Sequence, residues 1–538
     1  MRRILAATAA VAMGLAVGGG VIPAPAQART EPGYGATPPA IAWGECASAA
    51  LESRGAQCGF VTVPLDYSRP GGTTIKLAVS RIKHTSSEAD YQGVMLTNPG
   101  GPGGSGLTLS VLGEYVPGGV GGDYDWIGFD PRGVGSSEPA LTCDPGYAGY
   151  NRPYYVPVNA ALERAWLTRT ASYAQACDRA GGALLDHVKT TDTIADMESI
   201  RRALGAEQIN FYGFSYGTYL GQVYATLHPG KVRRMVLDGN VDPRRVWYDA
   251  NLDQDVAFDK NMDVFFAWVA KHDSVYHLGT RARAVRGKYY ATLQKLRKAP
   301  AGGLIGPDEW NDVFVSAGYN VGGWPEVAQA FAAWVDHGDA AALKELYPAP
   351  GDVEAENGYA MYLATQCTDV RWPKRWSTWK RDNWRTYAKA PFMTWNNAWY
   401  NAPCRSWGAK PGKPVTVNGR KAPPILLISE TKDAATPYSG SLEVRKRFPR
   451  AVLLEGVGGT THSGSLSGIA CTDDTVAAYL DTGALPKRVH GNRSDKQCEP
   501  VPAPDPAPVP AAARAKAESL NAADDAARPA LRDLVTIR

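Results

Sequence analysis

The sequence predicts an α/β fold, in which a mostly parallel sheet is flanked by helices and interrupted by an inserted helical segment. Short apolar runs alternate with helical patterns in the first half of the chain and return near residue 424. Between about residues 245 and 413 these runs are missing, and twelve of the 15 tryptophans lie between Trp247 and Trp407. Alternating strands and helices are typical of a parallel sheet with helices on both faces.

The individual elements are predicted by hydrophobic spacing and by turn residues. The first two strand-like runs flank the turn Ser68-Arg-Pro-Gly-Gly72, which is typical of a hairpin. Strands are expected over 59–63, 74–79, 93–97, 125–130, 208–212, 234–238, 424–429 and 451–455. Helices are expected over 191–204, 216–227, 256–272 and 327–337.

The two ends of the chain differ in composition from the rest. Arg2 and Arg3 precede an apolar, alanine-rich run that ends in Ala26-Gln27-Ala28, which predicts a secretory signal peptide cleaved after Ala28. A retained membrane anchor is the alternative, but the run is short and rich in glycine and alanine. From Glu499 onward the chain is rich in proline and alanine, and we expect a loosely packed extension.

These observations divide the chain into five parts. They are a signal peptide (1–28), the first part of the core (29–244), a helical lid (245–413), the second part of the core (414–498) and a C-terminal tail (499–538). The formal net charge of +4 is too balanced to favour nucleic acid or an anionic membrane as partner. We expect a secreted, extracellular monomer that is not attached to a membrane after the signal peptide is removed.

The chain has eight cysteines, an even number that suggests disulfides in an exported protein. No Cys-x-x-Cys motif is present, which argues against zinc or thioredoxin-like chemistry. Pairing between neighbours in the sequence is the simplest of the many possibilities. It predicts Cys46–Cys58, Cys143–Cys177, Cys367–Cys404 and Cys471–Cys498.

Gly213-Phe-Ser-Tyr-Gly217 matches the Gly-x-Ser-x-Gly motif and lies between a predicted strand and a predicted helix. In that context the glycines permit a sharp turn, which presents Ser215 above the sheet as a nucleophile. A plain strand-to-helix turn is the alternative. A serine hydroxyl is a weak nucleophile unless a base, oriented in turn by an acid, takes its proton.

The acid and the base are expected after Ser215, in that order. Asp433 and His462 each follow a predicted strand, at the edge where parallel sheets place their ligands. Asp238, which also ends a strand, is a rival for the acid, and His490 is a rival for the base.

The loop Thr97-Asn-Pro-Gly-Gly-Pro-Gly-Gly-Ser-Gly106 also matches the Gly-x-Gly-x-x-Gly pattern of dinucleotide-binding proteins. That interpretation needs an acid further on, for which Asp123, Asp125 and Asp130 are available. It leaves Ser215, Asp433 and His462 without a role. The loop is better explained as part of an oxyanion hole, with the N–H groups of Gly101 and Tyr216 as donors and Gly100 as the second choice.

Taken together, these motifs resemble the secreted bacterial tripeptidyl aminopeptidases of the α/β-hydrolase fold, which are related to proline iminopeptidases. The matching pieces are residues 97–106, WIGFDPRGVGSSEP at 126–139, GFSYGTYLG at 213–221, VLDGNVDP at 236–243 and DAATP at 433–437. The resemblance extends from about Trp43 to Cys498. It implies a serine exopeptidase that releases short peptides from free N-termini of peptides or proteins, without a metal or cofactor.

An exopeptidase must close one end of its cleft and neutralise an ammonium group. Acids of the predicted lid are the candidates, namely Asp369 first, and then Glu354 or Glu356. Two other classes of function stay open. One is an esterase or other acyl hydrolase, which would not require a free amine, and the other is a non-catalytic secreted binding protein.

Overall fold

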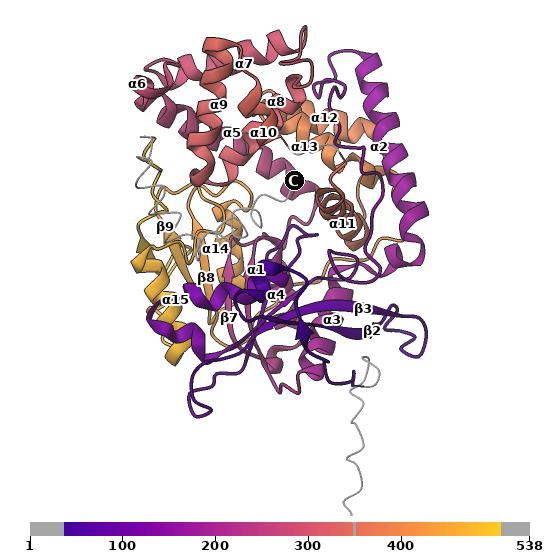
Figure 1. Cartoon of the computed structure of the whole chain (residues 1–538), viewed down its shortest axis with the longest axis vertical. Helices are drawn as coiled ribbons and strands as arrows, with labels where there is room; N and C mark the ends of the chain where they lie inside the picture. The colour runs from indigo at the N-terminus through magenta and orange to yellow at the C-terminus, as the bar shows by residue number, and fades with distance from the viewer. Residues whose placement is uncertain (1–36, 348–350, 507–538) are drawn as a thin grey trace, which may run out of the picture.

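The structure, a computed structural model, describes residues 37–347 and 351–506 (Figure 1). A ten-stranded sheet runs through it in the order β1-β2-β3-β5-β4-β6-β7-β8-β9-β10. The strands are β1 (Gly44–Glu45), β2 (Gln57–Pro64), β3 (Thr74–Ile82), β4 (Val94–Asn98), β5 (Asp125–Phe129), β6 (Ile209–Phe214), β7 (Val232–Asp238), β8 (Leu426–Glu430), β9 (Val452–Gly456) and β10 (Lys496–Cys498).

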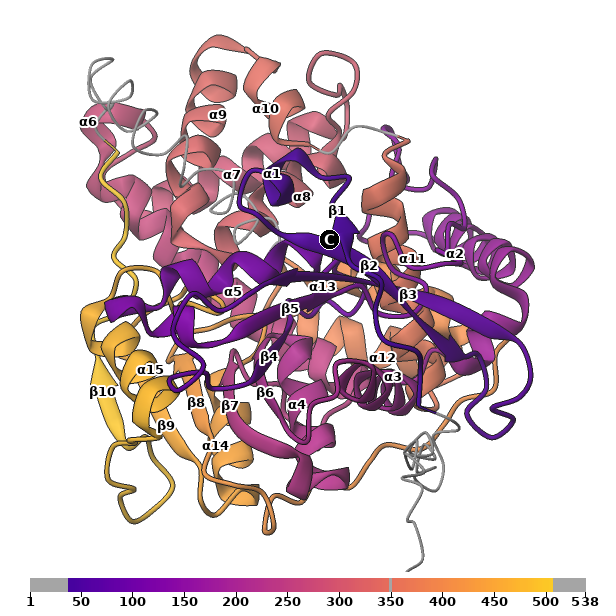
Figure 2. The same ribbon diagram turned by 60° about the horizontal axis from the view of Figure 1, so that its bottom comes forward.

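The sheet is antiparallel at one edge and parallel over the rest. Strands β1, β2 and β3 pair antiparallel with one another, and β3 pairs antiparallel with β5. From β5 to β10 every pairing is parallel, so the carboxyl ends of these strands meet at one edge (Figure 2). The predicted α/β class and its mostly parallel sheet are confirmed. The short strands β1 and β10 are found only in the structure.

Helices flank the sheet. Outside the segment between β7 and β8 the helices are α1 (Ala49–Glu52), α2 (Ala160–Gly181), α3 (Thr190–Ala203), α4 (Tyr216–Leu227), α14 (Tyr438–Arg447) and α15 (Ala470–Thr482), of which α2 lies beside the helices of that segment (Figure 1). The 3-10 helices are η1 (Leu107–Tyr115), η2 (Pro117–Asp123), η3 (Gly182–His187), η4 (Pro229–Lys231), η5 (Val321–Gly323) and η6 (Ala402–Arg405). Helix α4 starts directly after β6 and stops before Pro229, because the residue preceding a proline disfavours helical backbone.

Between β7 and β8 the described chain forms helices and no strand. They are α5 (Tyr248–Lys271), α6 (Asp273–Tyr276), α7 (Ala282–Leu296), α8 (Pro307–Tyr319), α9 (Trp324–His337), α10 (Ala341–Leu346), α11 (Val353–Asp369), α12 (Trp376–Tyr387) and α13 (Thr394–Asn401). We call this segment the insert. Figure 1 shows it stacked above the carboxyl end of the sheet. Helical patterning therefore predicts its content correctly, while the domain boundaries proposed at residues 244 and 413 stay a prediction.

The insert has two packing units. Aromatic residues of α5, α8 and α9, including Phe265, Trp310 and Phe331, form a core of their own. The tryptophans of α12 and α13 join the main core instead, where Trp399 stacks on Trp166 of α2 with ring centroids 5.7 Å apart. The second unit is thus attached to the sheet domain, while the first packs largely upon itself.

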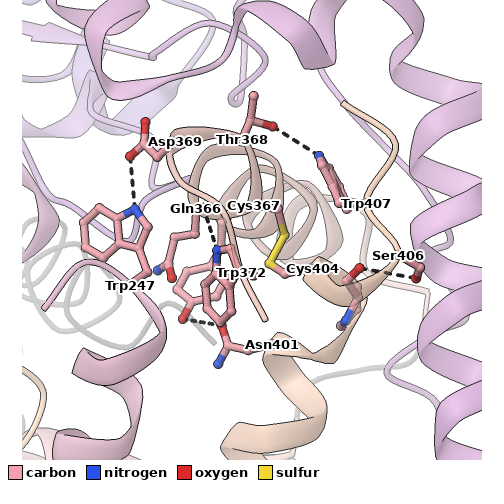
Figure 3. Close-up of a disulfide and its surroundings, with 12 residues drawn as sticks. Trp247, Gln366, Cys367, Thr368, Asp369, Trp372, Asn401, Cys404, Ser406 and Trp407 are labelled. Carbon is pink, nitrogen blue, oxygen red and sulfur yellow. Dashed lines mark hydrogen bonds between the residues drawn. A yellow bond between two sulfur atoms is a disulfide. The ribbon is translucent and has the colours of Figure 1, made fainter. Parts of the chain in front are cut away.

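The four predicted disulfides are confirmed. Cys46–Cys58, Cys143–Cys177, Cys367–Cys404 and Cys471–Cys498 are all bonded. The third ties the end of α11 to η6 inside the insert (Figure 3).

The beginning of the predicted tail, residues 499–506, is described by the structure and makes hydrogen bonds to the sheet and to the insert, while the expectation of a loosely packed extension stays a prediction. The Val501 N–H donates to Glu430 at 2.7 Å, and the indole N–H of Trp268 donates to the Pro504 carbonyl at 3.2 Å. We call residues 499–506 the strap, because they join β8 to helix α5 of the insert. Proline removes backbone donors but leaves carbonyls that can still accept such bonds.

Met1 to Ala28 lies outside the described residues, so the signal peptide stays a prediction. Within the two described ranges, none of the helices has both the length and the hydropathy that crossing a membrane requires.

A buried ion pair fixes the loop that follows β5. The Arg132 guanidinium makes two parallel hydrogen bonds to the Asp196 carboxylate, at 2.6 and 2.7 Å, and both side chains are almost fully buried. Arg132 also donates to the carbonyls of Leu65 and His187. The pair therefore joins α3 to the loops around β2 and β5.

We expect the substitution Arg132→Met to lower the free energy of unfolding by about 3–5 kcal/mol, because Asp196 would keep a buried charge without a cation. Urea denaturation followed by circular dichroism measures the loss. The matched control is Arg69→Met, which removes an exposed ion pair with Asp66 and should leave stability nearly unchanged. Equal losses in the two variants would contradict the role assigned to Arg132.

Candidate active site

Ser215 lies at the turn between β6 and α4, with a left-handed φ of 53° and a ψ of −124°. Such a backbone is unfavourable for a residue with a side chain and persists only when its surroundings enforce it. A Cβ atom on Gly213 would lie 2.6 Å from the Gly217 carbonyl oxygen, and one on Gly217 would lie 2.6 Å from the Asn98 oxygen. The Ser215 N–H donates to the Asp238 carbonyl at 3.0 Å. The glycines of the motif are therefore required by close backbone approach.

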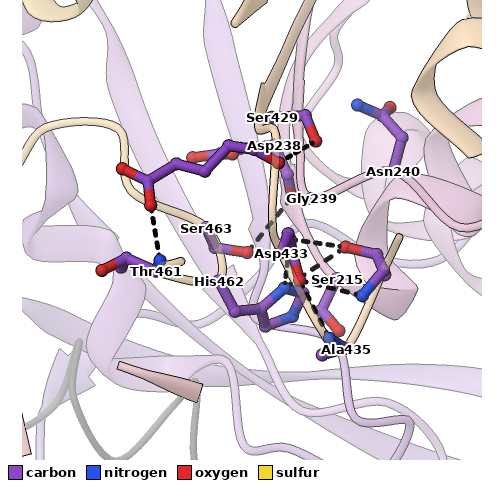
Figure 4. Close-up of polar contacts among 12 residues, drawn as sticks. Ser215, Asp238, Gly239, Asn240, Ser429, Asp433, Ala435, Thr461, His462 and Ser463 are labelled. Carbon is purple, nitrogen blue, oxygen red and sulfur yellow. Dashed lines mark hydrogen bonds and ion pairs between the residues drawn. The ribbon is translucent and has the colours of Figure 1, made fainter. Parts of the chain in front are cut away.

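Asp433 and His462 are brought together by the loops after β8 and β9 (Figure 4). Asp433 Oδ2 lies 2.8 Å from His462 Nδ1, and both side chains are buried. The carboxylate also accepts the N–H groups of Ala435 and Thr436 and the Thr436 hydroxyl. Since the carboxylate accepts a hydrogen bond from Nδ1–H, Nε2 is left as the basic nitrogen of the ring.

His462 Nε2 is buried and has no hydrogen-bond partner among the described residues. A Cβ on Gly239 would lie 2.9 Å from the His462 ring, so Gly239 packs directly against the imidazole. The residue before it, Asp238, holds the N–H of Ser215. Residues 238 and 239 thus place the imidazole beside the Ser215 turn. Catalytic hydrogen bonds in structures without substrate are often long, and no Ser215–His462 bond is formed here.

The two rivals occupy other positions. Asp238 Oδ2 accepts the N–H of Ser465 at 2.8 Å, and Asp238 Oδ1 has no partner in the described part of the chain. Burial raises the pKa of Asp238 to about 6. His462 bonds to Asp433 and not to Asp238. His490 is exposed on the loop after α15.

Gly100, in the loop after β4, packs on the Ser215 turn. Its φ is +99°, and a Cβ there would lie 2.6 Å from the Phe214 carbonyl oxygen and 2.8 Å from both Ser215 Cβ and the Tyr216 nitrogen. The Gly100 N–H donates to Asn98 Oδ1 at 2.9 Å. This donor is therefore occupied, which makes Gly100 the weaker candidate for an oxyanion hole.

Gly101 and Tyr216 both line the cavity in front of Ser215. The Gly101 N–H has no acceptor among residues 37–347 and 351–506. Tyr216 is the first residue of α4, where an N–H group has no partner within the helix. The two N–H groups predicted to bind an oxyanion are thus available beside the serine.

Two of the three acids considered for a dinucleotide site are occupied. Asp130 Oδ1 accepts the hydroxyl of Ser105 and the N–H of Gly106, at 2.6 and 2.9 Å. Asp125 accepts from the backbone and the ring of His84. Asp130 therefore fastens the glycine loop to the end of β5 and does not face a ligand.

The cavity extends from Ser215 into the insert, and its lining combines aromatic side chains with amide and charged ones. Helix α11 forms one of its walls, since residues at helical spacing along that helix face it. The lining includes Asp352, Ala355, Glu356, Tyr359, Tyr362 and Gln366. The insert thus covers the candidate nucleophile, as predicted for a lid.

The three predicted amine anchors differ in whether they line the cavity. Asp369 does not line the cavity, and its carboxylate accepts the N–H and the hydroxyl of Thr190 at 2.6 Å and the indole N–H of Trp247 at 3.1 Å (Figure 3). Glu354 is exposed and also lies outside the lining. The preference for Asp369 is therefore corrected, because its carboxylate lies outside the cavity lining and joins α3 to the insert. Glu356 is buried and does line the cavity.

Two residues of the insert hold the loop of His462 and carry no sequence signal for that role. Asn261 of α5 donates its side-chain amide to the Thr460 carbonyl at 3.2 Å. The His462 N–H donates to the carbonyl of Tyr319, the last residue of α8, at 2.8 Å. These contacts link positions more than a hundred residues apart, so only the folded chain reveals them.

We expect Gly100→Ala to slow the reaction of Ser215 with a fluorophosphonate by about 10²-fold or more, because the new methyl group displaces the Ser215 turn. The labelling rate measures the effect. Gly118→Ala is the matched control, because Gly118 also has a positive φ but open space around its Cβ position. Similar rates for both variants would contradict the packing argument.

Comparison with known proteins agrees with the fold and with the geometry of the candidate site. Residues 93–468 match the family model described as the alpha/beta hydrolase fold. The chain is 41% identical over 462 residues to the tripeptidyl aminopeptidase of Streptomyces coelicolor, covering 83% of this chain and 85% of that protein. It is 30% identical over 479 residues to the serine protease Hip1 of Mycobacterium tuberculosis, covering 83% and 89%. It is 31% identical over 524 residues to carboxylesterase B of the same species, covering 90% and 98%. These matches confirm the resemblance inferred from the motifs, and the chain belongs to the α/β-hydrolase family.

Proposed function

We propose that this protein is a serine exopeptidase that releases tripeptides from free N-termini through an acyl-enzyme. One observation carries the proposal. A buried His462–Asp433 pair, with Nε2 unpartnered, lies beside the Ser215 turn at the foot of a cavity that the insert covers. The likeness to a tripeptidyl aminopeptidase supports the choice of substrate class.

In the first half of the reaction, Ser215 Oγ attacks the scissile carbonyl carbon while His462 Nε2 takes the hydroxyl proton. The carbonyl oxygen becomes an oxyanion, which accepts the N–H groups of Gly101 and Tyr216. Collapse of the tetrahedral intermediate breaks the C–N bond, and the imidazolium gives its proton to the leaving amine. Asp433 stabilises the imidazolium and holds its tautomer throughout.

In the second half, water enters the place of the leaving amine. His462 Nε2 takes a proton from it as its oxygen attacks the ester carbon. The second tetrahedral intermediate then releases the carboxylate of the short peptide, and the proton returns to Ser215 Oγ.

Helix α11 connects the oxyanion loop with Glu356. A Cβ on Gly103 of the oxyanion loop would lie 2.3 Å from the Gly358 oxygen and 2.9 Å from the Tyr362 nitrogen, so the loop touches α11 there. Gly358 and Tyr362 follow Glu356 by two and six residues on the same helix. The proposed amine anchor and the loop proposed to bind the oxyanion are thus joined by one rigid element. The choice of three residues rests on the likeness to the tripeptidyl aminopeptidase.

Glu356 has the capacity to accept an ammonium group. Its Oε1 accepts from the backbone of Cys143 and Asp144 and from the Tyr173 hydroxyl, whereas Oε2 accepts only from Cys143, at 3.1 Å. No cation forms an ion pair with Glu356 in the described part of the chain. A substrate ammonium would supply the missing charge.

A second candidate function is an esterase or other acyl hydrolase on the same serine. It is favoured by the likeness to carboxylesterase B. A peptidase that prefers proline is a narrower variant of the first proposal. The esterase leaves Glu356, a buried acid of the cavity wall, without a role.

The proposal includes export from the cell. It is supported by the predicted leader ending at Ala28 and by the four disulfides, which persist in oxidising compartments.

We expect the purified protein to cleave Ala-Pro-Ala-p-nitroanilide with a free amine at least about tenfold faster than its N-acetylated form, because the acetyl group removes the charge that Glu356 would bind. Release of p-nitroaniline measures both rates, and Ser215→Ala should abolish cleavage. Equal rates would favour an endopeptidase or a general acyl hydrolase. Activity that survives in Ser215→Ala would overturn the assignment of the nucleophile.

We expect Glu356→Gln to lower kcat/KM for the free-amine substrate by about 10–100-fold, since a charge-assisted hydrogen bond is worth about 1.5–3 kcal/mol. The acetylated substrate should be cleaved at an unchanged rate. Glu354→Gln is the matched control on the same helix, where the side chain is exposed. If Glu356→Gln lowers kcat/KM equally for both substrates, the carboxylate contributes to packing and does not bind the amine.

A further inference from the structure

One buried carboxylate near the candidate site takes no part in the chemistry proposed above. Glu430 is the last residue of β8, three residues before Asp433, and is only 6% exposed. No Lys, Arg or His forms an ion pair with it in the described ranges. A buried acid without a cation is costly, so its retention calls for a physical explanation.

Both carboxylate oxygens of Glu430 accept backbone N–H groups. Oε2 accepts the N–H of Thr461 through a short hydrogen bond, and Oε1 accepts the N–H of Val501 at 2.7 Å. Thr461 immediately precedes His462 (Figure 4). Glu430 therefore holds the histidine loop with one oxygen and the strap with the other.

The surrounding chain is shaped to admit this carboxylate. A Cβ on Gly459 would lie 2.3 Å from Glu430 Cδ and 2.4 Å from its Oε2, and one on Gly456 would lie 3.1 Å from its Cγ. The backbone of the histidine loop thus packs against the carboxyl group itself. A side chain at Gly459 would displace it.

Three consecutive residues of the histidine loop are fixed from two sides. The insert holds the Thr460 carbonyl through Asn261 and the His462 N–H through Tyr319. Glu430 holds the Thr461 N–H between them from the side of the sheet. Without that contact, a backbone donor next to the base would be left buried and unpaired, and the loop would lose its anchor to β8.

We propose that Glu430 is a positioning residue for His462, which acts by fixing the backbone at Thr461 and by clamping the strap against the same loop. The proposal rests on the role of His462 as the general base. Glu430 does not touch the reacting atoms, so it should affect the rate of the chemical step more than the binding of substrate.

The test is steady-state kinetics of Glu430→Gln on the free-amine tripeptide substrate, with the melting temperature measured in parallel. The amide keeps the shape but replaces one acceptor with a donor, so one backbone N–H loses its partner. We expect kcat to fall by about 10–100-fold, because small misplacement of a catalytic group has effects of that size. KM should stay within about threefold.

Two further variants keep the outcome decisive. Glu455→Gln changes a buried acid on the adjacent strand that accepts from Gln497 at 2.7 Å, and it should behave like the natural protein. Gly459→Ala does not substitute Glu430, but the added methyl group would displace the Glu430 carboxyl group. This variant should therefore show the same loss of kcat even if Glu430→Gln folds poorly.

The proposal is overturned if Glu430→Gln and Gly459→Ala both keep the natural kcat, or if kcat falls only in proportion to the amount of folded protein. His462→Ala separates this result from the proposed function. If His462→Ala is inactive and Glu430→Gln keeps the natural kcat, only the role proposed for Glu430 is refuted. If His462→Ala is active, the proposed general base is refuted.

Discussion

The strained backbone at Ser215 is the constraint around which the rest of the site is arranged. Its left-handed φ is held because β4, β6 and β7 crowd the turn, and a side chain is excluded at Gly100, Gly213 and Gly217. The N–H of Ser215 is taken by the carbonyl at the end of β7. Because the turn is fixed by three strands, the hydroxyl and the neighbouring N–H groups of the oxyanion loop are presented in one place before any substrate arrives, which is the preorganisation that acyl transfer requires.

The insert does more than cover this turn. It supplies a donor from α5 and an acceptor from α8 to the loop that carries His462, while β8 and the strap hold the same loop through Glu430. The base is therefore located by contacts from both sides of the cavity. The insert and the histidine loop cannot move independently without breaking these hydrogen bonds. A displacement of the insert would therefore also displace His462, the proposed base.

Much of this arrangement is predictable from local sequence, and the remainder depends on contacts between distant segments. The five residues around Ser215 encode their own turn, and Asp433 and His462 follow strands whose carboxyl ends meet at one edge. Helix α2 escapes prediction because its buried positions mix Trp166 and Tyr173 with Thr170. The sequence also cannot decide which of Asp369 and Glu356 is the better candidate anchor for a substrate amine, since both are acids of the same helix. The donors around them, which lie on α3 and on the loop near Cys143, decide which carboxylate faces the cavity.

The Glu356 carboxylate at the cavity wall relates the cost of a buried charge to the choice of substrate. A carboxylate such as that of Glu356, held by neutral donors alone, keeps an uncompensated charge in a partly dehydrated place. A substrate with a free amine compensates this charge on binding, while an acylated substrate buries it further and adds no counter-charge. In the proposed exopeptidase, discrimination against blocked N-termini would then follow from the unfavourable free energy of an unpaired charge as much as from any attraction. Since Glu356 accepts the N–H of Cys143, which is bonded to Cys177 of α2, the proposed amine anchor is held by rigid elements.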